Sequence, residues 1–417
     1  MNYALLSLVF LIGAIILGFT RKINTGLVAV GLSLILGVIG GVTENDIMGG
    51  FPTKLFIMLL GVMYFFSIAQ ENGTLELLAK KVVSLAGKRT NLIPIIVYVF
   101  SVILSGIGPG TIPVMSLMAV FTMALAAELK VSPLLLSAIS IMGAAAGGIS
   151  SIAPTGIIGI TLAAEQGITG IERAYLMNAM LGFTIYAALL YIVLKGYKMK
   201  SETALKLSEL PKFNRNQIIT LIGMAVLVVG VIIFKYNVGL LSFSIALVLS
   251  LFRVASEKKA IANIPWSTLI LVTGVNVLMS IVIKLGGIDL LSSTLAGFMT
   301  DKTASAIISL TAGIMSWFSS ASGVVMPTLI PTVGDLIAKV GGNLSGLELI
   351  SAITNAANVA GTSPISTGGA LALASYVQNA HVSDKEQQDL FIKMFAVAIG
   401  GVLTMTVIAG IGLYRIF

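Results

Sequence analysis

Long apolar stretches recur along the whole chain, and short polar segments separate them. Most of these stretches have roughly the 20 residues that an α-helix needs to cross the hydrocarbon core of a bilayer. The sequence therefore predicts an all-α, polytopic membrane protein. The predicted spans cover residues 3–19, 25–42, 52–70, 172–195, 217–234, 238–252, 266–285 and 389–415.

Two further apolar regions are interrupted near their middle by Gly, Pro, Ser and Thr, as in the stretch LSGIGPGTIP from Leu104 to Pro113. Gly and Pro are unfavourable inside a helix, and unpaired backbone is costly in hydrocarbon. We therefore expect these breaks to line a wet cavity or a ligand site. The interruptions predict two re-entrant hairpins at 92–127 and 304–340, and two broken spanning helices at 132–165 and 347–378.

Residues of the first half reappear in the second half at a constant offset. Pro52 and Pro265 are 213 positions apart, and Lys22-x-Asn24 reappears at the same offset as Lys235-x-Asn237. Matches of Asn, Pro and Lys in one register are unlikely to arise from an apolar composition alone, so they indicate an internal repeat. The predicted domains are a first repeat at 1–200, a cytoplasmic linker at 201–216 and a second repeat at 217–417.

The distribution of charge predicts the orientation of the chain. There are 25 Lys and Arg residues against 17 Asp and Glu residues, and they fall mainly in loops, which favours membrane orientation over nucleic-acid binding. Placing both termini outside leaves most of the basic residues in cytoplasmic segments. The first repeat then begins outside and the second begins inside. Such inverted repeats are typical of secondary transporters.

Several classes of chemistry are missing from this composition. The chain has no Cys and one His, which excludes disulfides, thiol chemistry and most transition-metal sites. Paired acids are also absent near the breaks, so we do not expect an enzyme. Proton-coupled carriers usually keep an acidic residue at depth, and its absence favours coupling to Na⁺. Asn355 and Asn358 either face the site or bridge neighbouring helices.

Helix ends at the breaks supply the candidate binding groups. N-terminal N–H groups attract anions and C-terminal carbonyls attract cations, so four converging N-termini suit a small dianion. Thr155 and Thr367 correspond across the two breaks, and Ser105 and Ser319 across the two tips. The candidate substrate ligands are Pro109, Thr111, Thr155, Ser320, Ser363, Ser366 and Thr367. The candidate Na⁺ ligands are Ser105, Gly108, Gly110, Gly148 and Ser150 in the first half, and Ser319, Ser322, Gly361 and Thr362 in the second. No organic cofactor is expected.

An amphipathic, basic segment precedes the first hairpin, from Glu76 to Arg89. Its pattern predicts a helix that lies flat at the membrane surface. The equivalent segment of the second repeat runs from Asp289 to Lys302. We expect these two segments to be arms that link a fixed scaffold to a moving block.

The stretch GFPTKLFIMLLGVMYFFSIAQENGTLELLAKK, followed by IGPGTIP, resembles the N-terminal signature of the malonate/dicarboxylate carrier (MatC-like) family. That family belongs to the divalent-anion/sodium symporter group of the ion transporter superfamily, and the resemblance covers roughly the first 160 residues. It implies a homodimer in the inner membrane, with a scaffold and an elevator-type transport domain that takes up dicarboxylates with Na⁺. The better-known symporters carry Ser-Asn-Thr at each tip, and both asparagines are absent here.

Other functions remain open at this stage. The same architecture suits the membrane subunit of a tripartite transporter that needs a soluble binding protein. It also suits an H⁺-coupled or exchanging carrier of organic anions, and a passive anion channel. The sequence leaves the carried acid and the ion stoichiometry undefined.

Overall fold

The structure is a computed structural model that describes residues 2–87, 89–129, 131–199, 210–317, 319–364, 366, 369–370, 373 and 384–417. Every regular element in these residues is a helix. Five helical segments there are long and apolar enough to cross a membrane, namely Glu44–Glu71, Glu172–Val193, Trp266–Lys284, Ala321–Val340 and Lys385–Gly410. The prediction of an all-helical membrane protein is confirmed.

The two halves of the chain contain similar series of elements. The first half forms α1 (Tyr3–Arg21), α2 (Thr25–Gly40), α3 (Glu44–Gly49), α4 (Thr53–Glu71), α5 (Thr74–Ser84), η1 (Thr90–Leu92), α6 (Ile93–Gly106), α7 (Thr111–Leu129), α8 (Pro133–Gly147), α9 (Pro154–Glu165), α10 (Glu172–Val193) and η2 (Gly196–Lys198). The second half forms α11 (Arg215–Ile232), α12 (Val238–Leu251), α13 (Glu257–Ala262), α14 (Trp266–Lys284), α15 (Gly287–Ala296), α16 (Ala304–Trp317), η4 (Ala321–Val325), α17 (Met326–Leu329), η5 (Ile330–Thr332), α18 (Val333–Val340), α19 (Gly346–Val359), η6 (Ala360–Thr362), α21 (Asp384–Gly410) and η7 (Leu413–Arg415). The single helix α7 corresponds in the second half to the shorter segments η4, α17, η5 and α18.

Equivalent helices begin with equivalent local chemistry. The side chain of Asn24 caps α2 and that of Asn237 caps α12, each accepting a hydrogen bond from a backbone N–H of the first turn. The helices α5 and α15 both follow a glycine in the left-handed conformation, with φ of 73° at Gly73 and 78° at Gly286. The offset of 213 that relates the sequences therefore also relates the positions at which these helices begin.

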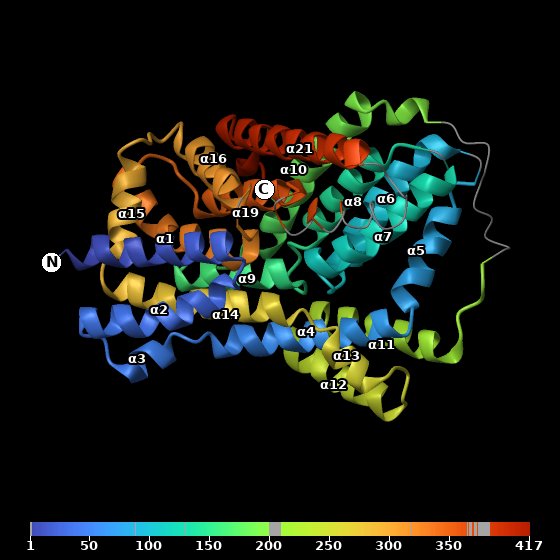
Figure 1. The fold of residues 1–417 in the computed structure, drawn as a ribbon, viewed down its shortest axis with the longest axis horizontal. Helices are drawn as coiled ribbons and strands as arrows, with labels where there is room; N and C mark the ends of the chain where they lie inside the picture. Colours follow the sequence, from blue (N-terminus) through green and yellow to red (C-terminus); the bar gives the residue numbers. More distant parts are fainter. Residues whose placement is uncertain are drawn as a thin grey trace.

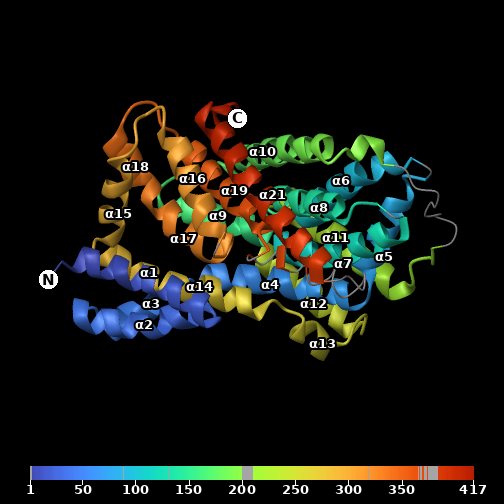
Figure 2. The same cartoon turned by 45° about the horizontal axis from the view of Figure 1, so that its top comes forward.

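The helices form two layers (Figures 1 and 2). One layer holds α1 to α4 together with α11 to α14. The other holds α6 to α10 and the helices from α16 to α21. The helices α5 and α15 stand at opposite ends of the molecule, where α5 contacts both α4 and α6 and α15 contacts both α14 and α18. Each of them thus connects one layer with the other, and the expectation that they link a fixed scaffold to a moving block stays a prediction.

Glycine contacts hold the first layer together at two equivalent crossings. A Cβ atom built on Gly274 would lie 2.3 Å from the carbonyl oxygen of Gly26, where α14 crosses α2. A Cβ atom built on Gly61 would lie 2.2 Å from the carbonyl oxygen of Gly239, where α4 crosses α12. Small residues allow membrane helices to approach backbone to backbone. The two pairs are related by the same offset of 213, which supports the predicted repeat.

Two ion pairs also occupy equivalent places, but with their charges exchanged. Asp46 on α3 pairs with Lys284 at the end of α14, with 2.7 Å between oxygen and nitrogen. Lys259 on α13 pairs with Glu71 at the end of α4, at 3.4 Å. Position 46 corresponds to 259, and position 71 to 284. Each short surface helix is therefore attached to the end of a long helix of its layer in the same way, whichever partner carries the positive charge.

The interrupted helices lie in the centre of the second layer. Every residue of α8 from Leu134 to Gly147 is buried, as is every residue of α19 from Glu348 to Val359. The chain turns from α6 into α7 between Gly106 and Thr111, within the predicted first tip. Helical structure stops at Gly147 and resumes at Pro154 between α8 and α9. The domain boundaries and the membrane orientation stay predictions.

Candidate functional site

One small cavity lies where all four interruptions meet, and we call it the central cavity. Its volume is about 40 Å³. It is lined by Thr111, Ile112 and Met115 of α7, Thr155 of α9, Ser320, Ala321 and Ser322 of the second tip, and Asn358, Gly361 and Ser366 of the second break. None of these lining residues is charged. Four segments that are far apart in the sequence therefore present hydroxyl, amide and backbone groups to one space.

The first tip and the first break meet at two threonines. Thr111 begins α7 and Thr155 is the second residue of α9, and their hydroxyl oxygens are 3.3 Å apart. Gly110 has a φ of +79°, and a Cβ atom on it would lie 2.5 Å from Cδ of Pro154. Glycine at this position therefore allows the tip to lie directly against the break. Two helix N-termini point at the same place, which favours an anion there.

The second tip enters the cavity through a capped turn. The hydroxyl of Ser320 accepts a hydrogen bond from the N–H of Gly323 at 3.1 Å, and the π-helical turn η4 begins at the next residue. Ser322 within this turn is 7% exposed and faces the cavity. Because the Ser320 hydroxyl is used as an acceptor by the cap, its proton remains available for a ligand oxygen.

The second break contributes Asn358, Gly361 and Ser366 to the lining. The Asn358 amide group donates to the carbonyl of Thr354 at 2.9 Å within its own helix. Asn355 instead donates to the carbonyl of Asn178 on α10 at 3.1 Å. Each of the two predicted roles is therefore found at one of these asparagines: Asn358 faces the site, and Asn355 bridges two helices.

Two of the residues predicted to bind Na⁺, Ser105 and Ser150, join the first hairpin to the first broken helix. The Ser105 hydroxyl donates to the carbonyl of Ala144 at 2.7 Å, and the Ser150 hydroxyl donates to that of Gly106 at 2.6 Å. The carbonyl of Gly148 accepts the N–H of Gly156 at 2.9 Å. These oxygens retain further lone pairs that an ion could use, although none of them lines the central cavity.

The remaining predicted residues lie outside the lining of the central cavity or outside the described residues. Ser319 and Thr362 donate their hydroxyls to carbonyls of their own helical turns, Met315 and Val359, at 2.7 and 2.8 Å. Ser363 is buried beside the second break without lining the cavity. Pro109 lines a neighbouring cavity, and Gly108 lies against α4, where a Cβ atom on it would be 2.2 Å from Cε2 of Phe66. Thr367 lies outside the described residues.

The structure corrects two correspondences that the sequence suggested. The Ser316 hydroxyl donates to the carbonyl of Ala357 at 2.7 Å, which reproduces the contact of Ser105, so Ser316 rather than Ser319 is its counterpart. At the breaks, Cβ atoms on Gly156 and Gly369 would each lie close to the carbonyl of an equivalent serine, Ser150 or Ser363. The breaks therefore correspond at an offset of 213 instead of 212, which removes the pairing of Thr155 with Thr367.

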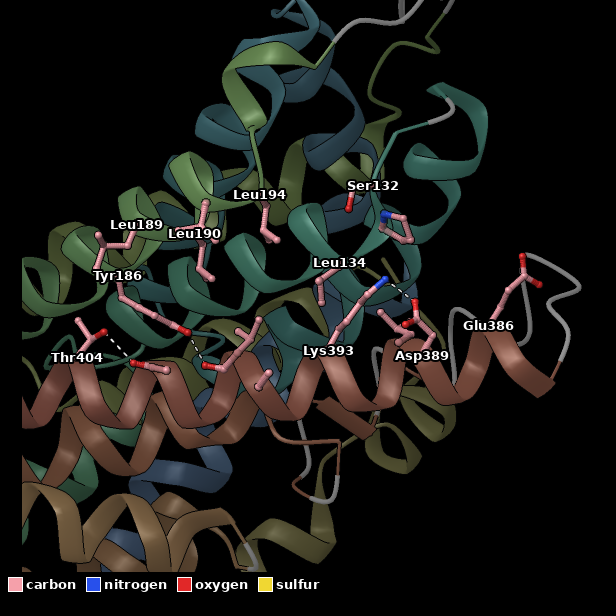
Figure 3. A pocket seen from close by; sticks show the side chains of 16 residues that line it. Ser132, Leu134, Tyr186, Leu189, Leu190, Leu194, Glu386, Asp389, Lys393 and Thr404 are labelled. Atoms are coloured by element: carbon pink, nitrogen blue, oxygen red, sulfur yellow. Dashed lines mark hydrogen bonds and ion pairs between the residues drawn. The ribbon is translucent and has the colours of Figure 1, made fainter.

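A much larger cavity of about 810 Å³ lies between α10 and α21 (Figure 3). Its polar side chains satisfy one another or nearby backbone. Lys393 is turned toward Asp389, with which it forms an ion pair, and the Thr404 hydroxyl donates to the carbonyl of Gly400 at 2.8 Å. Tyr186 donates to the carbonyl of Val397. The walls are otherwise mostly apolar, so this space lacks the converging polar groups of the central cavity.

Comparison with known families agrees with the sequence signature. Residues 1–148 match the family profile described as "Dicarboxylate carrier protein MatC N-terminus". Over these residues the chain is similar to MatC. The matched range contains the first arm α5 and the first hairpin tip, and it ends at Gly148, where α8 breaks. The predicted resemblance is therefore confirmed for the first third of the chain. No curated protein matches this chain in sequence.

Solved structures show a similar fold. The YdaH transporter of Alcanivorax borkumensis, whose crystal structure is described as having an unusual topology, superposes with a TM-score of 0.58. The alignment covers 89% of this chain and 87% of that chain at 10% sequence identity. At such an identity the similarity concerns the fold alone. This chain is thus a multi-pass membrane protein whose fold is similar to that of the YdaH transporter.

Proposed function

We propose that this protein is a secondary transporter of small dicarboxylates. The observation that carries the proposal is the single cavity lined by residues from all four interruptions. Broken helices at membrane depth are tolerated where they line a cavity, and their N-termini attract anionic groups. The match of residues 1–148 to a dicarboxylate carrier family supports the same substrate class.

The hydroxyls of the central cavity would hold the substrate carboxylates. Thr111 and Thr155 would bind one carboxylate together with the N-termini of α7 and α9. Ser320 and Ser366 would bind the other, with Ser363 and Thr367 nearby in the sequence. No lysine or arginine lines the cavity, so hydrogen bonds and helix dipoles would provide the attraction.

Sodium would be transported together with the substrate. Two Na⁺ ions would bind where each tip contacts its break, at the carbonyl and hydroxyl oxygens of the residues predicted from the sequence. Oxygen donors of this kind suit a hard cation, and the described residues hold no group of three or more acidic or His side chains placed to bind a metal. The positive ions would compensate the two negative charges of the substrate.

The size of the central cavity indicates a closed state. A volume of about 40 Å³ corresponds to about three water molecules, which is too little for a dicarboxylate. Binding therefore requires movement of the tips or of the layer that carries them. We propose an elevator-type movement of the second layer, with α5 and α15 as its connections, in an inner-membrane homodimer whose chain termini both lie outside.

Uptake into proteoliposomes tests the proposal directly. The purified protein should accumulate labelled malonate or succinate when a Na⁺ gradient is imposed, and it should do so without a soluble binding protein. Thr155→Val should raise the KM by roughly tenfold to a hundredfold, because it removes a hydrogen bond to a charged group. Absence of dicarboxylate uptake under both a Na⁺ gradient and a K⁺ gradient would refute the function. Uptake driven equally well by a K⁺ gradient would refute the coupling to Na⁺.

A further inference from the structure

Three neighbouring cavities form a line from the helix breaks to the end of α4. The central cavity is followed by one of about 10 Å³ and then by one of about 120 Å³, which we call the seam cavity. Ile112 lines all three, and Thr111 and Thr155 line the first two. Met63 of α4 and Pro265 before α14 line the last two. The spaces are therefore adjacent, and the side chain of Ile112 borders each of them.

The seam cavity leads from the interior to the surface. Its inner walls are Met63 and Ser67 of α4, which are 3% and 4% exposed. Its outer end is formed by Gln70 and Asn263, which are both exposed. These two amides can donate hydrogen bonds to a carboxylate that passes them. The seam cavity, which lies between α4 and α7, thus becomes more polar and more exposed toward the end of α4.

The equivalent place in the other half of the protein is packed differently. Ser67 corresponds to Ser280, and Asn263 corresponds to Gly50, each at an offset of 213. A Cβ atom built on Gly50 would lie 2.1 Å from the hydroxyl oxygen of Ser280, so these two residues are packed directly against each other. In a transporter built from two related halves, such a difference between equivalent seams marks the side to which the site is closer to opening.

We propose that the substrate passes between the central cavity and the membrane face at the end of α4 through this seam, and that Ile112 is the barrier on the path. This inference rests on the proposed transport of carboxylates. Ile112 follows Thr111 directly, so a ligand on the Thr111 hydroxyl lies next to the barrier. Gly108 of the tip lies against the ring of Phe66 on α4, and Phe66 lines the seam cavity together with Ile112, so Ile112 stands between the tip and the seam.

Cysteine accessibility tests the path without any change to the substrate site. The chain contains no cysteine, so each single variant carries one thiol. We would introduce Ser67→Cys, with Ser280→Cys as its matched control. Right-side-out and inside-out sealed vesicles of each variant would then be treated separately with a negatively charged methanethiosulfonate. Reagent added at the face at which α4 ends should label Ser67→Cys at least roughly tenfold faster than reagent added at the opposite face, and Ser280→Cys should not share this preference. Equal labelling of Ser67→Cys from the two faces, or faster labelling from the opposite face, would overturn the proposed path.

A second pair of variants tests the barrier itself. Met115→Cys places a thiol in the central cavity, beyond Ile112 on the proposed path. Adding Ile112→Ala should speed its labelling from the α4 face by roughly tenfold, and adding Ile112→Trp should slow it by a similar factor. Thermal melting in detergent identifies any variant that fails to fold. An unchanged labelling rate in folded Ile112→Ala protein would refute the role of Ile112.

The two proposals fail in different ways. If the protein transports dicarboxylates but Ser67→Cys stays unreactive, the function stands and the path is wrong. If Ser67→Cys reacts from the predicted face but no dicarboxylate is transported, the path stands and the substrate assignment is wrong.

Discussion

The contact between the first tip and the first break can be tested by a substitution that adds a single methyl group. Gly110→Ala adds a Cβ atom that would lie 2.5 Å from Cδ of Pro154, at a residue whose φ is +79°. The ring of a proline at a helix start cannot turn aside. The tip must therefore move away from the break, and the hydroxyls of Thr111 and Thr155 must separate beyond their present 3.3 Å.

The expected effect of Gly110→Ala follows from two separate energy terms, the backbone strain at residue 110 and the overlap with Pro154. A left-handed conformation costs an alanine about 1 to 2 kcal/mol, and the overlap with Pro154 adds about 1 to 3 kcal/mol. Gly167 is a matched control, because its φ is +74° and nothing lies within 4 Å of an added Cβ atom. Gly167→Ala therefore carries the first term without the second. The second term is relieved when the tip withdraws, so it should appear as weaker substrate binding by roughly fivefold to a hundredfold.

The assay compares both variants in proteoliposomes, normalised to the amount of folded protein. Gly110→Ala should raise the KM for the dicarboxylate, while Gly167→Ala should keep the wild-type KM even if it melts at a lower temperature. Wild-type kinetics in Gly110→Ala would mean that the contact with Pro154 does not shape the site. An equal loss of affinity in both variants would mean that backbone strain, and not the position of the tip, is responsible.

Three further contacts elsewhere in the fold can be tested by substitution, each by thermal melting in detergent. Ser316→Ala leaves the buried carbonyl that it bonds without a partner and should destabilise the protein by about 1 to 3 kcal/mol. Arg415→Ala removes the cation 2.7 Å from Glu348, a carboxylate that is 1% exposed, and should cost about 3 kcal/mol, whereas Arg415→Lys should cost less. Asp46→Lys or Lys284→Asp alone should cost at most about 1 kcal/mol, and the double exchange should restore that loss. Losses that simply add in the double exchange would show that this ion pair contributes nothing.

Much of the fold could be predicted because the repeat leaves a direct trace in the sequence. The residues that recur at an offset of 213 include helix caps and turns, such as Asn24 with Asn237 and Gly73 with Gly286. Their chemistry acts locally, so it fixes where a helix begins whatever surrounds it. The positions of the breaks could be predicted for the same reason, since Gly and Pro act on their own stretch of backbone.

The exact partners at the tips could not be predicted in this way. The α6 helix begins at Ile93 and α16 at Ala304, an offset of 211 instead of 213, so Ser105 corresponds to Ser316. Ser319 was the more obvious match because it stands directly in the Ser-rich tip. Only the contact of each hydroxyl with α8 or α19 distinguishes the two serines, and that contact depends on packing between distant helices. The contribution of Ile112 was missed because an isoleucine gives no polar signal.

The second layer combines close-packed helix crossings with a partly filled space at the tips and breaks, and we expect rearrangement at that space. In the first layer, helices cross backbone to backbone at Gly26 with Gly274 and at Gly61 with Gly239, where no side chain can adjust. Close-packed contacts of this kind have one arrangement and resist sliding. In the second layer, α6 and α8 also cross backbone to backbone at Gly143 and Gly147, but the hydroxyls of Thr111 and Thr155 meet beside a space that is only partly filled. Contacts through single hydroxyls can exchange partners with a ligand at little cost. Rearrangement on binding should therefore begin at the tips and breaks around this space.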